Sequence, residues 1–158
     1  MSETSGAHLI QTPESQIVDS LGFVTPNNAL RVVDENGNNL GPNQPGELYV
    51  KQPILLLGYL KDPEKTKKLV DEDGWVHTGD MVSYNENGEY IFHDRMSEII
   101  KFRGILVSPN ELRFHLLKQP DILEVAIVPV PHPLDGEWPM AFIQKFPGSK
   151  VRLKFYEN

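Results

Sequence analysis

Short apolar runs separated by asparagine-glycine and aspartate-glycine turns are the feature that most constrains the fold of this sequence. These turns fall within residues 35–38, 71–74 and 85–88. Glycine, and asparagine to a lesser degree, adopts the positive φ that tight hairpin turns require. The apolar runs between the turns are too short for helices of ordinary length. Residues 20–93 are therefore expected to form a small, mostly antiparallel β unit, a distorted barrel.

The strands of this unit are predicted from runs rich in β-branched, aromatic and leucine residues. These runs are Ala29–Val33, Glu47–Val50, Leu55–Leu60, Met81–Tyr84 and Tyr90–Phe92. Alternation in the first run and the turn that follows it favour a hairpin into the second.

Two helix starts are each marked by a capping residue followed by proline. Asp62 precedes Pro63, and this helix should run to about Val70. The run Ser108–Glu111 is a full capping box, in which the serine hydroxyl can accept the backbone N–H of the glutamate. The second helix should end before Pro120, because the residue that precedes a proline disfavours helical geometry.

After about residue 95 the pattern changes to a short α+β unit. Further apolar strands are predicted at Ile99–Lys101, Leu106–Val107, Val125–Val130 and Met140–Phe146. The expected fold class is therefore α+β: a small distorted antiparallel β-barrel subdomain, a hinge, and a partial α+β domain.

Composition excludes several classes of function. The 158 residues carry 15 basic and 22 acidic side chains, a net charge of −7, which argues against a nucleic-acid or anionic-membrane surface. No apolar run approaches membrane-spanning length. The absence of cysteine rules out disulfides and thiolate metal sites. The five histidines lack metal-ligand spacing.

Asp80 and Arg95 are the strongest candidates for a binding site. A carboxylate can accept both hydrogen bonds of a vicinal diol such as ribose, and a planar guanidinium can hold that carboxylate or reach the sugar. Two ordinary interpretations remain open from the residues alone. Asp80 could cap a local turn, and Arg95 could form a weak surface pair with Asp94 or Glu98.

Seven ordered motifs resemble the adenylate-forming superfamily of acyl-CoA synthetases, 4-coumarate-CoA ligases and firefly-type luciferases. The motifs are Ser2–Thr4, Gly46–Leu48, Gly58–Tyr59, Gly74–Asp80, Asp94–Arg95, Lys101–Glu111 and, near the end, Gly136–Pro139. Several motifs in family-like order are far more specific than one short match. The resemblance implies that residues 1–95 are the third, barrel-like subdomain, with residues 1–19 poorly ordered, and that residues 96–158 are part of the C-terminal domain.

The same resemblance implies roles for individual residues around an adenylate. Asp80 and Arg95 would hold the ribose of ATP or AMP, and Ser2 would replace a phosphate-bonding threonine. Glu3 would coordinate the Mg²⁺ on ATP. Both of these early residues stand near a chain end, where order is often poor.

The resemblance also assigns parts of the second, thioester-forming step. Lys101 would assist catalysis there, and Gly104 would open a narrow lane for the pantetheine arm of CoA. Ser97 occupies the position of the hinge about which the C-terminal domain swings. The family usually keeps aspartate or lysine at that position, so serine is a departure. A lysine that begins a strand can equally be a solvated charge.

The expected function is that of a fragment of an ATP-dependent acyl-CoA ligase, acting on nucleotide, acyl and CoA substrates. The phosphate loop, the acyl pocket and the C-terminal catalytic lysine of the family have no match in this sequence, so we expect the chain to be inactive alone. The alternative is a non-catalytic nucleotide-sensing or protein-interaction module. A cytoplasmic or peroxisomal location is expected, without a C-terminal peroxisomal tripeptide. Exposed former interdomain surface could mediate association.

Overall fold

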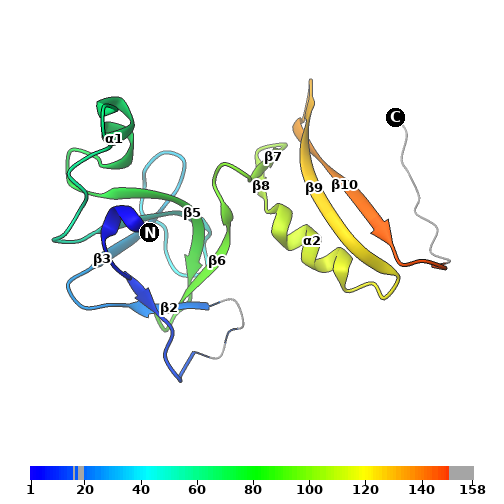
Figure 1. Ribbon diagram of the computed structural model, residues 1–158, viewed down its shortest axis with the longest axis horizontal. Coiled ribbons are helices and arrows are strands. Elements are labelled where there is room, and N and C mark those ends of the chain that lie inside the picture. Colours follow the sequence, from blue (N-terminus) through cyan, green and yellow to red (C-terminus); the bar gives the residue numbers. More distant parts are fainter. Residues whose placement is uncertain (16, 18–19, 150–158) are drawn as a thin grey trace. The chain divides into compact units, whose positions relative to one another are not determined.

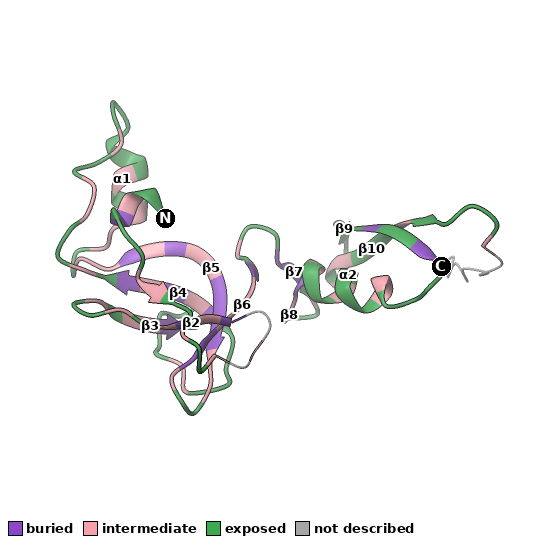
Figure 2. Ribbon diagram, turned by 60° about the horizontal axis from the view of Figure 1, so that its bottom comes forward, coloured by how far each residue is buried: buried purple, intermediate pink, exposed green. Residues whose placement is uncertain are grey.

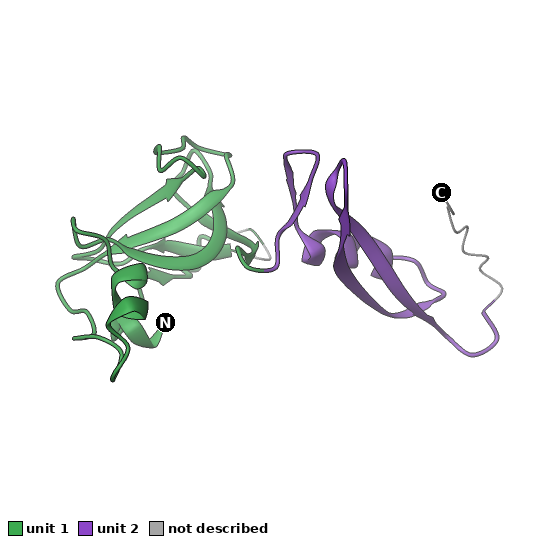
Figure 3. Cartoon of the chain, turned by 90° about the horizontal axis from the view of Figure 1, so that it is seen from above, with its two compact units in different colours: residues 1–97 green, residues 98–158 purple. Residues whose placement is uncertain are grey.

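The computed structural model describes residues 1–15, 17 and 20–149 (Figure 1). The chain divides into two compact units, residues 1–97 (unit 1) and 98–158 (unit 2), which Figure 3 shows in different colours. Unit 1 contains η1 (Ser2–Thr4), β1 (Leu9–Ile10), β2 (Ser20–Val24), β3 (Ala29–Val33), β4 (Gly46–Lys51), α1 (Pro63–Leu69), β5 (Val76–Tyr84) and β6 (Tyr90–Arg95).

The strands of unit 1 form one six-stranded antiparallel sheet in the order β1-β2-β6-β5-β4-β3. The sheet curls without closing, because β1 and β3 each have one neighbour in it. The distorted barrel expected from the turns is thus present as an open, curled sheet. Its core is built by apolar side chains of β3, β4, β5 and β6, namely Val32, Leu48, Val50, Val82 and Tyr90. Figure 2 shows the buried positions along these strands.

Unit 2 contains β7 (Ile100–Phe102), β8 (Ile105–Val107), α2 (Pro109–Leu117), β9 (Ile122–His132) and β10 (Gly136–Lys145). Its four-stranded sheet has the order β8-β7-β10-β9, and α2 packs along β9 (Figure 1). A curled antiparallel sheet in unit 1, together with a sheet covered by one helix in unit 2, confirms the α+β class.

Both predicted helices begin as expected. The Asp62 carboxylate accepts the N–H of Lys65 at 2.9 Å, and the Ser108 hydroxyl accepts the N–H of Glu111 at 3.1 Å. These caps satisfy backbone donors that the first turn leaves unpaired. Neither helix, nor any other within the described residues, is long and apolar enough to cross a lipid bilayer.

The predicted strand at Leu55–Leu60 is wrong, because the residues from Gln52 to Pro63 form no strand. Leu57 and Leu60 are almost fully exposed, at 105% and 89%. The Leu56 N–H bonds to the carbonyl of Glu3 in η1, outside any sheet. An apolar run becomes a strand where a neighbouring strand offers a ladder of partners, and no strand among the described residues pairs with this run.

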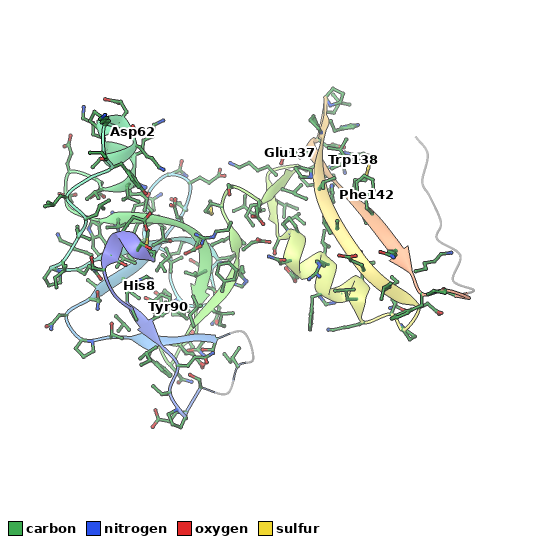
Figure 4. The ribbon with its side chains drawn as sticks, in the orientation of Figure 1. His8, Asp62, Tyr90, Glu137, Trp138 and Phe142 are labelled. Carbon is green, nitrogen blue, oxygen red and sulfur yellow. The ribbon has the colours of Figure 1, made fainter. Side chains whose placement is uncertain are left out.

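β9 and β10 are longer than the sequence predicts and expose apolar side chains. Met140 is paired with Val128, and Phe142 with Ala126, so these four residues share one face of the hairpin. Met140 is 45% exposed and Phe142 59%. Phe142 projects from β10 in Figure 4. The association expected through exposed apolar surface stays a prediction.

Candidate functional site

The structure brings Asp80 and Arg95 together within unit 1. They are direct partners in the antiparallel pair of β5 and β6. Directly opposed residues place their Cβ atoms about 5 Å apart on the same face of a sheet. The Arg95 Nη1 atom lies 2.7 Å from the Asp80 Oδ1 atom. The two side chains that the sequence separates by fourteen intervening positions therefore form one ion pair.

This pair leaves the aspartate short of hydrogen bonds. Asp80 Oδ1 is buried, yet no N–H or O–H of the described residues, Arg95 included, donates a hydrogen bond to it. The Asp80 side chain is 23% exposed and that of Arg95 57%. An ion pair with one well-exposed partner is worth about 1 kcal/mol or less, so Arg95 can leave at little cost.

Burial raises the pKa of the Asp80 carboxyl above its ordinary value, and the charge of Arg95 offsets this only in part. A carboxylate that is removed from water, and that the protein supplies with few donors, gains from any ligand that brings donors of its own. A vicinal diol brings two. The pair can thus accept a sugar edge, provided that Arg95 turns aside or joins the contact.

Two side chains that the sequence did not single out hold the backbone of this turn. Thr78 Oγ1 donates to the carbonyl of Leu48 at 2.8 Å and accepts the N–H of Asp80 at 3.1 Å. Glu47 Oε1 accepts the N–H of Gly79 at 3.2 Å. Both Glu47 and Thr78 lie inside motifs of the resemblance, which was the only signal that could have pointed to them.

Gly79 allows β5 to bend at this point. Its φ is +69°, a backbone conformation that residues with a side chain rarely adopt. A Cβ there would meet no atom within 4 Å. The Gly79 carbonyl accepts the N–H of Met96 at 2.8 Å. Ser97, the predicted hinge residue, follows as an exposed residue of a turn and ends unit 1.

Arg95 does not form the surface pair that the ordinary interpretation offered. Asp94 is 1% exposed, and its Oδ1 atom accepts the backbone N–H of Arg95 at 2.9 Å. The guanidinium instead reaches Asp80. Asp94 therefore fixes the main chain of Arg95 while the side chain faces the neighbouring strand.

Lys101 and Gly104 belong to unit 2. Lys101 lies in β7 with an exposed side chain, and its N–H donates to Glu137 Oε2 at 3.0 Å. Gly104 is the second residue of the two-residue turn between β7 and β8, with a φ of +77° and open space where a Cβ would stand. The turn is narrow and its glycine presents no side chain.

Ser2 and Glu3 are the first two residues of η1, and its last residue, Thr4, is only 1% exposed. The Tyr59 hydroxyl donates to Glu3 Oε1 at 2.8 Å. Hydrogen bonds from its own backbone and from Tyr59 lower the pKa of the Glu3 carboxyl. The expected poor order of residues 1–19 stays a prediction, and residues 16, 18 and 19 lie outside the described residues.

Glu3 fits Mg²⁺ only as a single ligand. Its carboxylate is ionised and hard, but no group of three acidic or histidine side chains among the described residues could hold a metal ion. Mg²⁺ is commonly held by one or two carboxylates together with substrate phosphates and water. Glu3 could supply one such ligand to an ion that a nucleotide brings with it.

A pocket of about 250 Å³ lies beside η1, apart from the Asp80 and Arg95 pair. It is lined by Thr4–Ala7, Pro26–Asn28 and Gln52–Ile54. Neither Asp80 nor Arg95 lines this pocket.

Comparison with known proteins places the chain in a family. A model of the family described as AMP-binding enzyme matches residues 1–60. A 4-coumarate–CoA ligase 3 from Oryza sativa subsp. japonica is 43% identical over 133 residues, which cover 84% of this chain and 24% of the relative. A luciferin 4-monooxygenase from Nipponoluciola cruciata is 39% identical over 155 residues, 98% of this chain and 28% of the relative.

Solved structures agree with the sequence comparison. A crystal structure of ATP-bound MatB from Rhodopseudomonas palustris superposes with a TM-score of 0.84 at 29% identity, covering 96% of this chain and 30% of that one. The chain thus spans about a quarter to a third of the length of the proteins that it matches. Matching motifs along the chain and a shared fold show that it belongs to the adenylate-forming, AMP-binding enzyme family, with acyl-CoA ligases and luciferases as its relatives.

Proposed function

We propose that this chain carries the ribose-binding corner and the thioester loop of an ATP-dependent acyl-CoA ligase. In such an enzyme ATP and an acid form an acyl-AMP and diphosphate, and CoA then displaces AMP to give the acyl-CoA. The chain contributes Asp80 and Arg95 to the nucleotide, and Lys101 with Gly104 to the second step.

The observation that carries this proposal is the half-satisfied carboxylate of Asp80. The protein supplies a buried oxygen, one exposed arginine and a turn held by Glu47 and Thr78. This is a prearranged acceptor that lacks donors. Ribose hydroxyls are donors of the right number and spacing for it, and ATP is bound in the MatB structure that this chain resembles.

The remaining roles follow from the resemblance. Ser97 serves as the hinge, and Lys101 assists thioester formation while Gly104 leaves a lane for CoA. Ser2 contacts phosphate, and Glu3 provides one ligand to Mg²⁺. The ion, when bound, neutralises charge on the phosphates. Residues 1–95 correspond to the third subdomain and residues 96–158 to part of the C-terminal domain of the ligase.

The isolated 158-residue chain is expected to bind but not to catalyse. Adenylation depends on holding phosphate, acid and a catalytic lysine together, and the phosphate loop and acyl pocket have no match in this sequence. An assay of diphosphate exchange with fatty and aromatic acids should therefore give no signal above blank. Turnover above blank would contradict this part of the proposal.

Calorimetric titration with AMP tests the nucleotide site. The wild-type chain should bind AMP saturably, and Asp80→Asn should bind about tenfold or more weakly, because hydrogen bonds to a charged group contribute about 1.5–3 kcal/mol. Asp73→Asn is the matched control, since Asp73 lies in an exposed turn near the same strand. Equal affinities of wild type and Asp80→Asn would contradict the assignment.

A parallel titration with CoA separates the ligase part from the alternative module. Heat from both AMP and CoA supports the ligase assignment. AMP binding without CoA binding favours the nucleotide-sensing module. No heat with either ligand leaves a protein-interaction role.

A further inference from the structure

The turn between β7 and β8 places a residue other than glycine at a positive φ. Arg103 has a φ of +50° and Gly104 a φ of +77°, in a two-residue hairpin turn. Glycine adopts this region freely, but a left-handed conformation costs a residue such as arginine about 1 kcal/mol. Contacts from outside the hairpin can offset this cost.

Those contacts come from Asp135, in the turn between β9 and β10. Asp135 Oδ1 accepts from Arg103 Nε at 2.7 Å, and Oδ2 accepts from Nη2 at 3.3 Å. The carbonyl of Asp135 also accepts the backbone N–H of Arg103 at 2.8 Å. A two-pronged carboxylate and a guanidinium fix direction as well as distance.

Asp135 is itself rigidly placed. Trp138 Nε1 donates to its Oδ2 atom at 2.8 Å, and its own N–H donates to His132 Nδ1 at 3.2 Å. The rings of His132 and Trp138 stack with centroids 4.7 Å apart. Its side chain is 12% exposed, whereas that of Arg103 is 63% exposed. A shielded, fully bonded acid thus anchors a solvent-facing cation.

The next two residues hold the other end of the turn. Glu137 Oε2 accepts the N–H of Lys101 at 3.0 Å. Gly136 packs so closely that a Cβ there would lie 2.7 Å from the Lys101 carbonyl oxygen. Figure 4 shows Glu137 and Trp138 at this end of the sheet, beside β7. The segment Asp135–Trp138 therefore grips both Lys101 and Arg103.

We infer that Asp135 is a positioning residue for the Lys101–Gly104 loop, which it holds in one conformation through Arg103. The expected effect of Asp135 on thioester formation rests on the proposed function. Its expected effect on the loop does not, because removal of the carboxylate charge should loosen the loop whether or not CoA binds. Asp135 touches no substrate and acts only by ordering the residues that do.

Amide hydrogen exchange of the full 158-residue chain tests whether Asp135 orders the Lys101–Gly104 loop. Asp135→Asn should speed exchange of the Lys101 and Arg103 amides about tenfold. The chemical shift of the Arg103 Nε–H proton should also move to that of a proton without a hydrogen bond to the protein. Glu124→Gln, an exposed position on β9, is the control and should change neither. Unchanged exchange and an unchanged Arg103 Nε–H signal in Asp135→Asn would overturn the inference.

Arg103→Gln removes the same pair from its exposed side, and it serves if Asp135→Asn fails to fold. It should give the same tenfold faster exchange at Lys101. Protection equal to that of the wild type would again overturn the inference.

A CoA titration by NMR adds a readout that a merely structural residue would not move. If the wild type binds CoA with shifts at Lys101 and Gly104, Asp135→Asn should bind about tenfold more weakly, although the melting temperature of unit 2 falls by only about 1–2 °C. Equal CoA affinity would refute the positioning role. Absence of CoA binding by the wild type would sink the proposed thioester role instead, while the exchange data still decide how the loop is held.

Discussion

Two aspartate–arginine pairs, one in each unit, use the same chemistry in opposite ways. Asp80 has one ion-pair contact, and its buried Oδ1 receives no hydrogen bond from the described residues. Asp135 accepts from both arms of Arg103 and from the Trp138 indole. The first carboxylate is left with capacity for a ligand, and the second is saturated by the protein.

The electrostatics of the two acids diverge accordingly. Burial raises the pKa of Asp80, and Arg95 compensates only in part. Hydrogen bonds from Arg103 and then Trp138 lower the pKa of Asp135. A carboxylate that the protein fully satisfies stabilises the fold, whereas one that it leaves unsatisfied costs stability until a ligand arrives. This difference separates a scaffold contact from a binding contact.

The glycines beside the two aspartates also differ, and replacing Gly136 should cause the largest loss of stability. Gly136 has a φ of +82° and backbone within 2.7 Å of its would-be Cβ. Gly136→Ala should destabilise unit 2 by about 2–4 kcal/mol, because left-handed strain and overpacking add. Thermal unfolding followed by circular dichroism would measure the loss.

Gly79→Ala is the matched variant at the binding turn. Its φ is +69°, but a Cβ there meets nothing within 4 Å. The expected loss in unit 1 is only about 1 kcal/mol, from backbone strain alone. Equal losses at the two glycines would show that close packing does not distinguish the two turns.

Glu47→Ala should have the next largest effect. It removes the acceptor of the Gly79 N–H and should cost about 1 kcal/mol of unit 1 stability. AMP binding should weaken as well, because the turn that carries Asp80 loosens. Glu47→Gln keeps an oxygen at the same place and should recover most of both losses in denaturant unfolding and calorimetry. A Gln variant as damaged as Ala would argue against the hydrogen bond.

Asparagine variants of the two aspartates should change stability with opposite sign. Because the pKa of Asp80 is raised in the folded state, its favourable contribution to the free energy of unfolding is present below the ordinary pKa of 3.8. That contribution is lost as pH rises through the pKa of the folded state. The lowered pKa of Asp135 means that its contribution is present above 3.8 and is lost as pH falls through the folded value.

At pH 7, Asp80→Asn should therefore raise the melting temperature of unit 1, and Asp135→Asn should lower that of unit 2, each by about 1–2 °C. Both differences should shrink toward pH 3, where the carboxyls approach protonation. Melting curves from pH 3 to 7 measure this. Two shifts of the same sign at pH 7 would remove the distinction between the pairs.

Arg95→Met should give the smallest effect, visible only in a titration. The charge of Arg95 lowers the pKa of Asp80, so its removal should raise that pKa further. Carboxyl carbon NMR shifts of Asp80 in wild type and variant report it directly. No change would mean that the 2.7 Å contact does not persist in solution.

Local signals in the sequence predicted the elements that depend on neighbours in the chain. The caps Asp62 and Ser108 fixed both helix starts, because an N-cap bonds to an N–H only three residues on. The Leu55–Leu60 strand failed, because strand formation depends on a distant partner that sequence patterns do not reveal.

In the candidate site, too, some residues were predicted from the sequence and others were not. Asp80 and Arg95 were predicted from a motif resemblance, and the structure places them opposite each other. The braces at Glu47 and Asp135 were not predicted, because each joins segments about thirty residues apart in sequence, Glu47 to Gly79 and Asp135 to Arg103. Pairing of that range depends on the register of the sheets, which short motifs do not specify.

One titration of the isotopically labelled chain with AMP, followed at the carboxyl carbons of both aspartates, shows whether Asp80 is the carboxylate that binds the ligand. We expect a saturable shift at Asp80, with accompanying shifts at Arg95 and Gly79, and an unmoved signal at Asp135. An unmoved Asp80 signal at saturating AMP, or equal movement of both carboxyls, would contradict this expectation.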